Sequence, residues 1–205
     1  MTVTRWTFVR HAPVIGGDGV LYATHDEPAD CSDSAAFARL ARAMPKGGVL
    51  VTSGLKRTEA TADAIVASGW TPAERLIDAR LAEQHYGQWH GRERATIEAG
   101  APQRLRHRHW FTTADDQPPG GESFRDVAAR VAASMDELTA RFAGCSIVAV
   151  SHGGAIRAAL AHALGLDLDR ALTISCANLS STRIDHVPGE GLGGDWRTVF
   201  VNVRP

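Results

Sequence analysis

The stretch Trp6-Thr7-Phe8-Val9-Arg10-His11-Ala12-Pro13 places an arginine and a histidine directly after a short apolar run. Aromatic and β-branched residues favour a strand, and Pro13 prevents further pairing with a neighbouring strand. Ligands of open α/β sheets bind beyond the carboxyl ends of the strands. We therefore expect a buried strand that delivers Arg10 and His11 to a ligand site. The alternative, from these residues alone, is an ordinary strand end with a hydrogen-bonded histidine.

The rest of the chain continues an α/β pattern. Segments with helical spacing or helix-start signals predict helices at about residues 34–44, 54–66, 102–113, 124–142 and 155–164. Apolar or alternating runs predict strands at about residues 48–52, 75–78, 146–151, 178–186 and 196–203. Ser53 and Ser123 are expected to cap the helices that follow them, and Gly153 with Gly154 is expected to turn the chain after a strand.

Composition limits the class of protein. The chain has 205 residues, of which 44% are apolar and 22% charged, and its formal net charge is -1. These values predict a single domain over residues 1–205, with a small lid-like excursion at about 84–121, and give no reason to expect nucleic acid or a membrane as a partner. The start of the chain lacks the apolar core of a signal peptide, so we expect a cytoplasmic protein. Three widely separated cysteines, Cys31, Cys145 and Cys176, indicate neither a disulfide framework nor a zinc site.

Three further stretches repeat the layout of the first. Arg57 falls in the first turn of a predicted helix, where free amide groups and the helix dipole favour an anion. His152 follows the strand at 146–151, and Gly153 lets the backbone approach a ligand closely. Glu83 supplies a carboxylate between them. Together with Arg10 and His11, this set suits a phosphate dianion, because phosphoryl transfer depends mainly on positioning and charge stabilisation.

The chain resembles the histidine phosphatase superfamily, the phosphoglycerate mutase-like proteins with a two-step phosphohistidine mechanism. The motifs that carry the resemblance run in family order: Arg10-His11-Ala12, Ser53 to Arg57 with Thr58, Glu59 and Thr61, Glu83 with Gly87 and Trp89, Pro119 to Ser123, and Ser151 to Gly154. Within the superfamily, the short chain and the segments at 22–28 and 87–124 look most like alpha-ribazole phosphatase-like members. One departure is Ala12, where the family most often has glycine.

The resemblance implies both a fold and a set of roles. The fold is a three-layer αβα sandwich with a mostly parallel central sheet. His11 would be the nucleophile, and Glu83 the proton donor. Arg10, Arg57 and His152, with Gly153, would form the phosphate pocket. The implied activity is metal-independent and cofactor-independent hydrolysis of a small phosphomonoester, with inorganic phosphate as product. A phosphoglycerate-type phosphomutase and a weakly catalytic phospho-ligand-binding or interaction protein are the alternatives. The substrate and the oligomeric state stay open.

Other signals are interpreted as structural. Each cysteine lacks an arginine six positions later, which excludes a cysteine phosphatase, and Gly189 to Gly194 spells G-x-G-x-x-G but precedes a strand and opens no helix. His107 and His109, with Arg104, Arg106 and Arg108, are taken as a solvated basic face; a lid that reaches an anionic substrate and a metal site are the alternatives. The tryptophans at positions 6, 70, 110 and 196 are interpreted as core or covering residues rather than ligand contacts, whereas at Trp89 the two roles are about equally expected.

Overall fold

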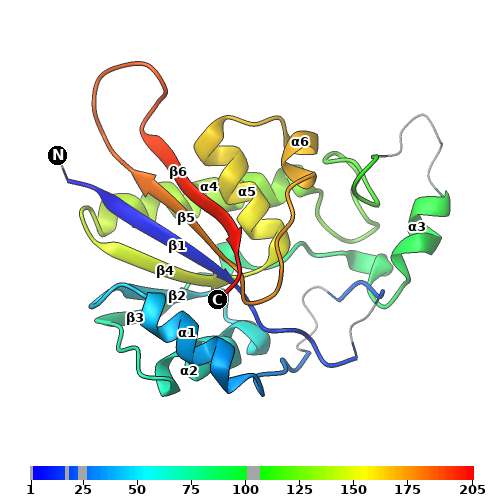
Figure 1. The fold of residues 1–205 in the computed structure, drawn as a ribbon. Coiled ribbons are helices and arrows are strands. Elements are labelled where there is room, and N and C mark those ends of the chain that lie inside the picture. The colour runs from blue at the N-terminus through cyan, green and yellow to red at the C-terminus, as the bar shows by residue number, and fades with distance from the viewer. Residues whose placement is uncertain (1, 17–18, 23–26, 101–106) are drawn as a thin grey trace.

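A central sheet of six strands, in the order β3-β2-β4-β1-β5-β6, positions every other element in the computed structural model (Figure 1). The structure describes residues 2–16, 19–22, 27–100 and 107–205. Its strands are β1 Thr4–Arg10, β2 Val49–Thr52, β3 Glu74–Ile77, β4 Ser146–Ser151, β5 Ser181–His186 and β6 Trp196–Val203. Strands β3, β2, β4 and β1 run parallel, whereas β5 and β6 are antiparallel additions at one edge. The predicted, mostly parallel sheet is confirmed.

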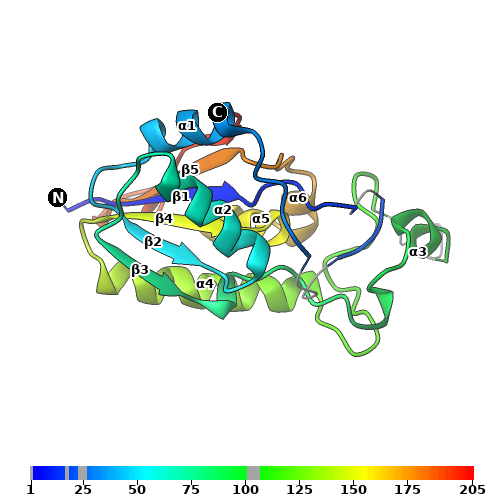
Figure 2. The same ribbon diagram turned by 90° about the horizontal axis from the view of Figure 1, so that it is seen from below.

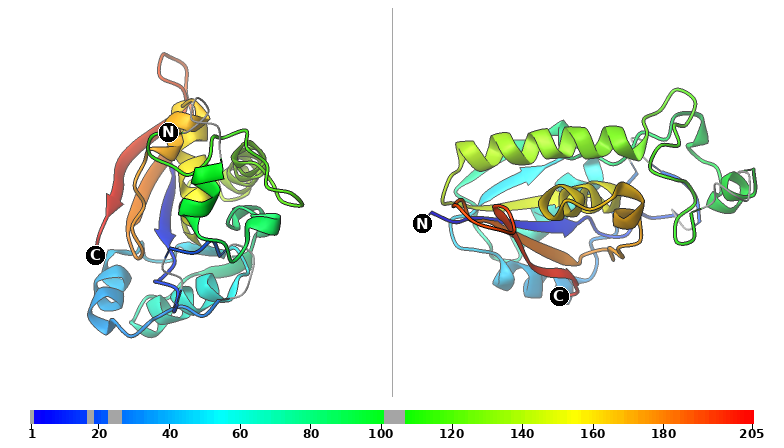
Figure 3. Two further views of the ribbon diagram at one scale, coloured as in Figure 1. Left: turned by 90° about the vertical axis from the view of Figure 1, so that its right-hand side faces the viewer. Right: turned by 90° about the horizontal axis from the view of Figure 1, so that it is seen from above.

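Helices cover both faces of this sheet, as Figures 2 and 3 show. Helices α1 (Ser34–Ala43) and α2 (Lys56–Ala67) lie on one face, and α4 (Phe124–Arg141) and α5 (Gly153–Leu164) lie on the other, with the short α6 (Leu168–Leu172) beside α5. This is the predicted three-layer αβα sandwich. The remaining elements are α3 (Arg94–Gly100) and two single 3₁₀ turns, η1 (Ala79–Leu81) and η2 (Gly87–Trp89).

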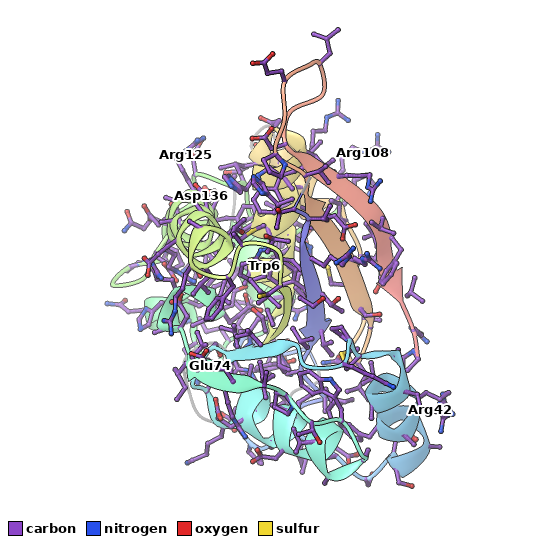
Figure 4. The ribbon with its side chains drawn as sticks, turned by 90° about the vertical axis from the view of Figure 1, so that its left-hand side faces the viewer. Trp6, Arg42, Glu74, Arg108, Arg125 and Asp136 are labelled. Atoms are coloured by element: carbon purple, nitrogen blue, oxygen red, sulfur yellow. The ribbon has the colours of Figure 1, made fainter. Side chains whose placement is uncertain are left out.

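The alternation of side chains along the buried strands produces the two halves of the core. Trp6 and Phe8 of β1 join the cluster under α4 and α5, whereas Val9 joins the cluster under α1 and α2. The indole nitrogen of Trp6 donates a 2.8 Å hydrogen bond to Thr139 of α4, so the buried ring has its polar group satisfied. Figure 4 shows Trp6 inside the molecule, whereas Asp136 lies on α4 and is exposed.

The long helix α4 forms as the sequence predicts. Ser123 accepts a hydrogen bond from the backbone of Asp126, and the Asp126 side chain accepts one from the backbone of Ser123. This reciprocal capping box satisfies amide groups that would otherwise lack partners.

The prediction that Ser53 caps α2 is wrong. Leu55 is the N-cap residue and makes no side-chain capping bond, because the hydroxyl of Ser53 is engaged with His152, 2.8 Å away, and with Thr58. The expectation that Gly153 and Gly154 turn the chain is also wrong, since both belong to the first turn of α5.

The predicted helix at 102–113 is wrong for its described part, and residues 102–106 lie outside the described residues. Residues 107–113 form a chain of bends, because side chains capture the amide groups that a helix would use. His107 Nδ1 accepts from His109, and an Asp116 carboxylate oxygen accepts from Thr113. Strand β5 starts at Ser181 rather than 178, since Leu179 has a left-handed φ of 59°.

The carboxyl ends of β1, β2 and β4 meet at one end of the sheet. Figures 1 and 2 show that the chain around α3 gathers beyond this end, away from the N-terminus of β1. Val9 and Arg10 pair with Val150 and Ser151, so the residues that follow β1 and β4 emerge side by side. No helix within the described residues is long and apolar enough to cross a membrane.

Candidate active site

His11 follows β1 as a fully buried side chain, only 1% exposed. Its Nδ1 lies 2.7 Å from the carbonyl oxygen of Ala12, and because a carbonyl can only accept, Nδ1 must carry the proton. Nε2 is therefore the nitrogen with a free electron pair. Burial, together with the charges of Arg57 and Arg10, lowers the pKa of His11 to about 3. The ring is thus neutral at physiological pH, which is the state that a nucleophile requires.

Arg10, the residue before His11, is held by residues 176–180, which lead into β5 and which we call the strap. Arg10 donates from Nη1 to the carbonyl of Cys176, and the backbone oxygen of Arg10 accepts from Leu179 at 3.0 Å. The side-chain amide of Asn178 donates to the carbonyl oxygen of His11 at 2.8 Å. In the described structure the buried Nε of Arg10 has no hydrogen-bond partner. One face of this guanidinium is therefore fixed while one donor stays available for an anion.

His152 and Arg57 form a second fixed pair. His152 Nε2 lies 2.8 Å from the hydroxyl of Ser53, and Arg57 donates from Nε to His152 Nδ1 at 3.3 Å. Nδ1 must accept in this bond, so the proton of the neutral ring lies on Nε2 and is donated to Ser53. Burial, with the positive charges nearby, lowers the pKa of His152 well below its usual value. His152 thereby orients Arg57, and a direct bond to a phosphate would require one of these contacts to exchange.

The rings of His11 and His152 lie next to each other. Their ring centroids lie 5.1 Å apart with an interplanar angle of 56°. Arg57, which is 0% exposed, lies in the first turn of α2, as the sequence predicts. The structure thus gathers His11, His152, Arg10 and Arg57 at the carboxyl ends of the parallel strands.

Glu83 lies against the start of α5. Its carboxylate oxygens accept from the backbone amide of Gly154 at 3.1 and 3.4 Å. A side chain at Gly154 would overlap Oε1 of Glu83, so the absence of one makes this contact possible. The hydroxyl of Ser151 also donates to the carbonyl of Leu81 at 2.7 Å, which ties the segment before Glu83 to the end of β4.

Arg130 of α4 clamps the same segment. Its guanidinium donates to three carbonyl groups of one short segment, those of Arg80, Ala82 and Glu83. Glu122, from the predicted motif at 119–123, pairs with Arg130 at 2.7 Å and also accepts from the backbone of His85. The motif therefore acts by fixing the backbone that carries Glu83.

A cavity of about 120 Å³ joins these groups to the segment beyond the sheet. Arg10, Glu83 and Gly153 contribute one part of its wall. The remaining residues that line the cavity are Leu21, Tyr22, Tyr86, Arg94, Trp110 and Arg157. The interpretation of Trp110 as a mere covering residue is therefore incomplete. Trp6 and Trp70 are buried as expected, and Trp89 lines a separate hollow with Phe111.

Ala12 takes the place of the usual glycine without strain. It is fully buried in the core cluster under α1 and α2, and among the described non-glycine residues only Leu179 and Asn202 have a positive φ. Its amide donates to the hydroxyl of Thr61 at 2.9 Å, so the methyl group packs while the backbone is held from α2.

The basic segment does not form a described metal site. Arg104 and Arg106 lie outside the described residues, and His107 uses its ring nitrogens for the carbonyl of Asp169 and the amide of His109. Among the described residues, no group of three or more acidic, histidine or cysteine side chains could hold a metal ion.

Sequence reasoning missed Arg130, Arg157 and Asn178. Each lies in an element that was predicted for other reasons, and each has at least one contact with a residue 17 or more positions away. A buried position for a charged residue on the apolar stripe of α5 is the one signal that could have marked Arg157.

Comparison with known proteins gives a consistent result. Residues 8–198 match the family described as the histidine phosphatase superfamily, branch 1. A glucosyl-3-phosphoglycerate phosphatase of Mycolicibacterium vanbaalenii is 35% identical over 164 residues, which cover 73% of this chain and 71% of that protein. The bifunctional protein Rv2228c of Mycobacterium tuberculosis is 34% identical over 121 residues, which cover 58% of this chain. The match spans only about a third (32%) of the length of that protein.

Solved structures agree with the fold. The structure of mycobacterial glucosyl-3-phosphoglycerate phosphatase Rv2419c has a TM-score of 0.80 and 27% identity, and the match covers 98% of this chain and 99% of that one. A candidate alpha-ribazole-5'-phosphate phosphatase of Escherichia coli has a TM-score of 0.76 over 98% and 97% of the two chains. At 19% identity it shows the shared fold alone.

Proposed function

The chain belongs to the histidine phosphatase superfamily, branch 1, and from this membership we propose that it hydrolyses a small phosphomonoester through a phosphohistidine on His11. The observation that carries the proposal is the state of His11. Its ring is neutral, its Nδ1 proton is fixed on the carbonyl of Ala12, and Nε2 keeps its electron pair beside two arginines. This arrangement is the one that nucleophilic attack on a phosphate dianion needs.

Each neighbouring group has a role in this proposal. Arg10 and Arg57 bind the nonbridging oxygens, since the guanidinium fork suits a pair of anionic oxygens. His152 keeps Arg57 in place and supports negative charge in the transition state, and Gly153 leaves room for the phosphate at the start of α5. Glu83 acts as the proton donor.

The proposed reaction has two steps. Nε2 of His11 forms a bond to phosphorus while the ester P–O bond breaks, and the leaving oxygen takes its proton from the Glu83 carboxyl group. A water molecule then attacks phosphorus and gives a proton to the Glu83 carboxylate as the P–N bond breaks. Inorganic phosphate leaves, and both residues return to their starting states.

We also infer that residues 1–205 work as one cytoplasmic domain in which the excursion at about 84–121 covers the site. The single sheet supports this inference, and so does the contribution of Tyr86, Arg94 and Trp110 to the cavity. The free thiols of Cys31, Cys145 and Cys176 support a reducing compartment.

Rapid-quench trapping of the phosphoenzyme tests the proposal. With 4-nitrophenyl phosphate we expect an acid-labile, base-stable phosphoenzyme and release of inorganic phosphate, both abolished in His11→Ala. The exposed His109→Ala is the matched control and should keep both signals. Excess chelator should leave the rate unchanged.

Normal turnover by His11→Ala, or a rate that collapses with chelator and returns with zinc or magnesium, would overturn the mechanism. Transfer of the phosphoryl group to a second phosphoglycerate instead of to water would indicate the mutase. Phosphate binding without turnover would indicate the ligand-binding alternative.

A further inference from the structure

Asn202, near the end of β6, has a left-handed backbone conformation with a φ of 57°. The register of β5 against β6 shifts by one residue between Ser181 and Arg183, so two residues of β6, one of them Asn202, stand opposite Thr182. Such a β-bulge often re-aims a side chain beside a functional site. The backbone amide of Asn202 donates to the hydroxyl of Thr182 at 3.1 Å, which holds the bulge in place.

The side chain that the bulge re-aims reaches the strap. Oδ1 of Asn202 accepts from the backbone amide of Ala177 at 2.6 Å. Ala177 in turn begins a closed turn, because its carbonyl oxygen accepts from the amide of Ser180 at 3.1 Å and from the hydroxyl of Ser180 at 2.7 Å. A single bond from β6 therefore fixes the turn at 177–180.

The strap holds the last residue of β1 and the histidine that follows it. The side-chain amide of Asn178 donates to the carbonyl of His11, and the backbone amide of Leu179 donates to the carbonyl of Arg10. Just before the turn, the carbonyl of Cys176 accepts from Nη1 of Arg10, while the buried Nε of Arg10 has no partner in the described structure. The position of the strap therefore decides where this guanidinium points.

The contact of Asn202 with the strap is not a by-product of core packing. Strand β6 is at the edge of the sheet, and the side chains on either side of Asn202, those of Val201 and Val203, are 36% and 48% exposed. Asn202 does not line the active-site cavity either. Its route to the site is the bond to Ala177.

We propose that Asn202 is a positioning residue for the phosphate pocket. Its side chain fixes the strap through Ala177, and the strap orients the guanidinium of Arg10 toward the phosphate. The inference rests on the proposed phosphatase function. A planar pair of donors must be aligned with two anionic oxygens, so a small displacement of the strap weakens the grip on both.

Three variants separate the acceptor from the backbone conformation. Asn202→Gly removes the acceptor and adopts a positive φ without strain. Asn202→Asp keeps an oxygen that can accept from Ala177 and a side chain that tolerates the left-handed conformation. Val201→Gly is the matched control, because it removes an exposed side chain from the neighbouring position of the same strand.

Calorimetric titration with inorganic phosphate measures the pocket, and hydrolysis of 4-nitrophenyl phosphate measures turnover. We expect Asn202→Gly to raise the Kd for phosphate roughly 10-fold, the lower end of the range for hydrogen bonds to charged groups. Its kcat should fall roughly 10- to 100-fold, as for a small misplacement far from the chemistry. Asn202→Asp should stay close to the wild type in both values. Val201→Gly should keep both values even if it unfolds at a lower temperature.

A double-mutant cycle with Arg10→Lys tests the route. The guanidinium that the strap orients is absent from that background, so Asn202→Gly should lower kcat much less there than in the wild type. A purely structural role of Asn202 would give losses that multiply.

If Asn202→Gly fails to fold, Asn202→Ala removes the same acceptor and takes its place. Wild-type phosphate binding and kcat in the folded variant without the acceptor would overturn the positioning role. Equal losses in Asn202→Asp or Val201→Gly, or losses that multiply in the cycle, would overturn it too. Absence of 4-nitrophenyl phosphate hydrolysis by the wild type would instead overturn the proposed function, and the phosphate titration would still test Asn202.

Discussion

An arginine or a lysine at position 57 would place the same charge at the start of α2. Only the arginine can make the observed contact with His152. Its Nε bond to His152 Nδ1 orients the guanidinium, whereas a lysine is a point charge without a planar pair of donors. We expect Arg57→Lys to lower kcat roughly 10²- to 10³-fold, by analogy with removal of one oxyanion donor. Steady-state kinetics with 4-nitrophenyl phosphate measures this loss. Arg42→Lys is the matched control, and full activity in Arg57→Lys would show that charge alone suffices.

The effect of losing the Glu83 proton donor should depend on how much the leaving group needs to be protonated. An alkoxide must be protonated as the P–O bond breaks, whereas a nitrophenolate departs without help. Glu83→Gln keeps the size and an oxygen that can accept from Gly154. We expect it to slow phosphoenzyme formation from an alkyl phosphate about 10²- to 10⁴-fold and from 4-nitrophenyl phosphate far less. The burst phase must be measured on its own, because the proposed mechanism also uses Glu83 to activate water in the second step. Equal burst losses would assign Glu83 a positioning role.

At the scale of the element, the first turn of α5 has glycine at position 154, which is unfavourable for a helix but leaves room for Glu83. Glycine costs a helix up to about 1 kcal/mol relative to alanine, so Gly154→Ala should favour the helix itself. The added methyl group would overlap the Glu83 carboxylate and displace it. We expect an approximately 10²-fold lower kcat on an alkyl phosphate, as for a misplaced catalytic group. Thermal unfolding should change little.

Gly100→Ala is the control for this substitution, since Gly100 lies in α3 with open space around its Cα and an ordinary φ. Unchanged turnover by Gly154→Ala would mean that Glu83 does not need its contact with the helix.

The elements show what a sequence can and cannot predict. Strand β1, helix α4 and the residues at strand ends were predictable, because hydrophobic periodicity and capping signals are local. Ser53 was misassigned because a tertiary partner, His152, competes for the same hydroxyl. The bends at 107–113 depend on Asp116 and on Asp169 from a distant helix, which accepts from Ala114 at 2.7 Å. Such long-range hydrogen bonds produce no periodic pattern in the sequence, so they could not be predicted from it.

At the scale of the whole molecule, the buried neutral histidines make stability depend on pH. The unfolded chain protonates His11 below pH 6.5, but the folded chain does so only near its lowered pKa of about 3. Stability is therefore present above pH 6.5 and lost as pH falls between these two values. From pH 6.5 to 5 we expect a loss on the order of 2 kcal/mol from His11, and His152 acts in the same direction.

Urea unfolding at a series of pH values measures this dependence. His11→Asn should show a shallower fall in the free energy of unfolding, whereas His109→Ala should keep the wild-type slope. A wild-type stability that stays constant from pH 7 to 5 would contradict the neutral, buried state of both rings.

Strand β1 lies between β4 and β5, and this position has a consequence for how the protein is made. Trp6 finds its partner Thr139 only 133 positions later, and the strands that flank β1 begin at Ser146 and Ser181. A growing chain on the ribosome therefore carries β1 as an unpaired apolar segment until β4 has been made. Long-range pairing of this kind slows folding and exposes apolar surface meanwhile. Nascent chains that stop before β4 would expose Trp6 and Phe8, which chaperones could then bind. In such chains His11 would lack the residues that surround it in the folded site.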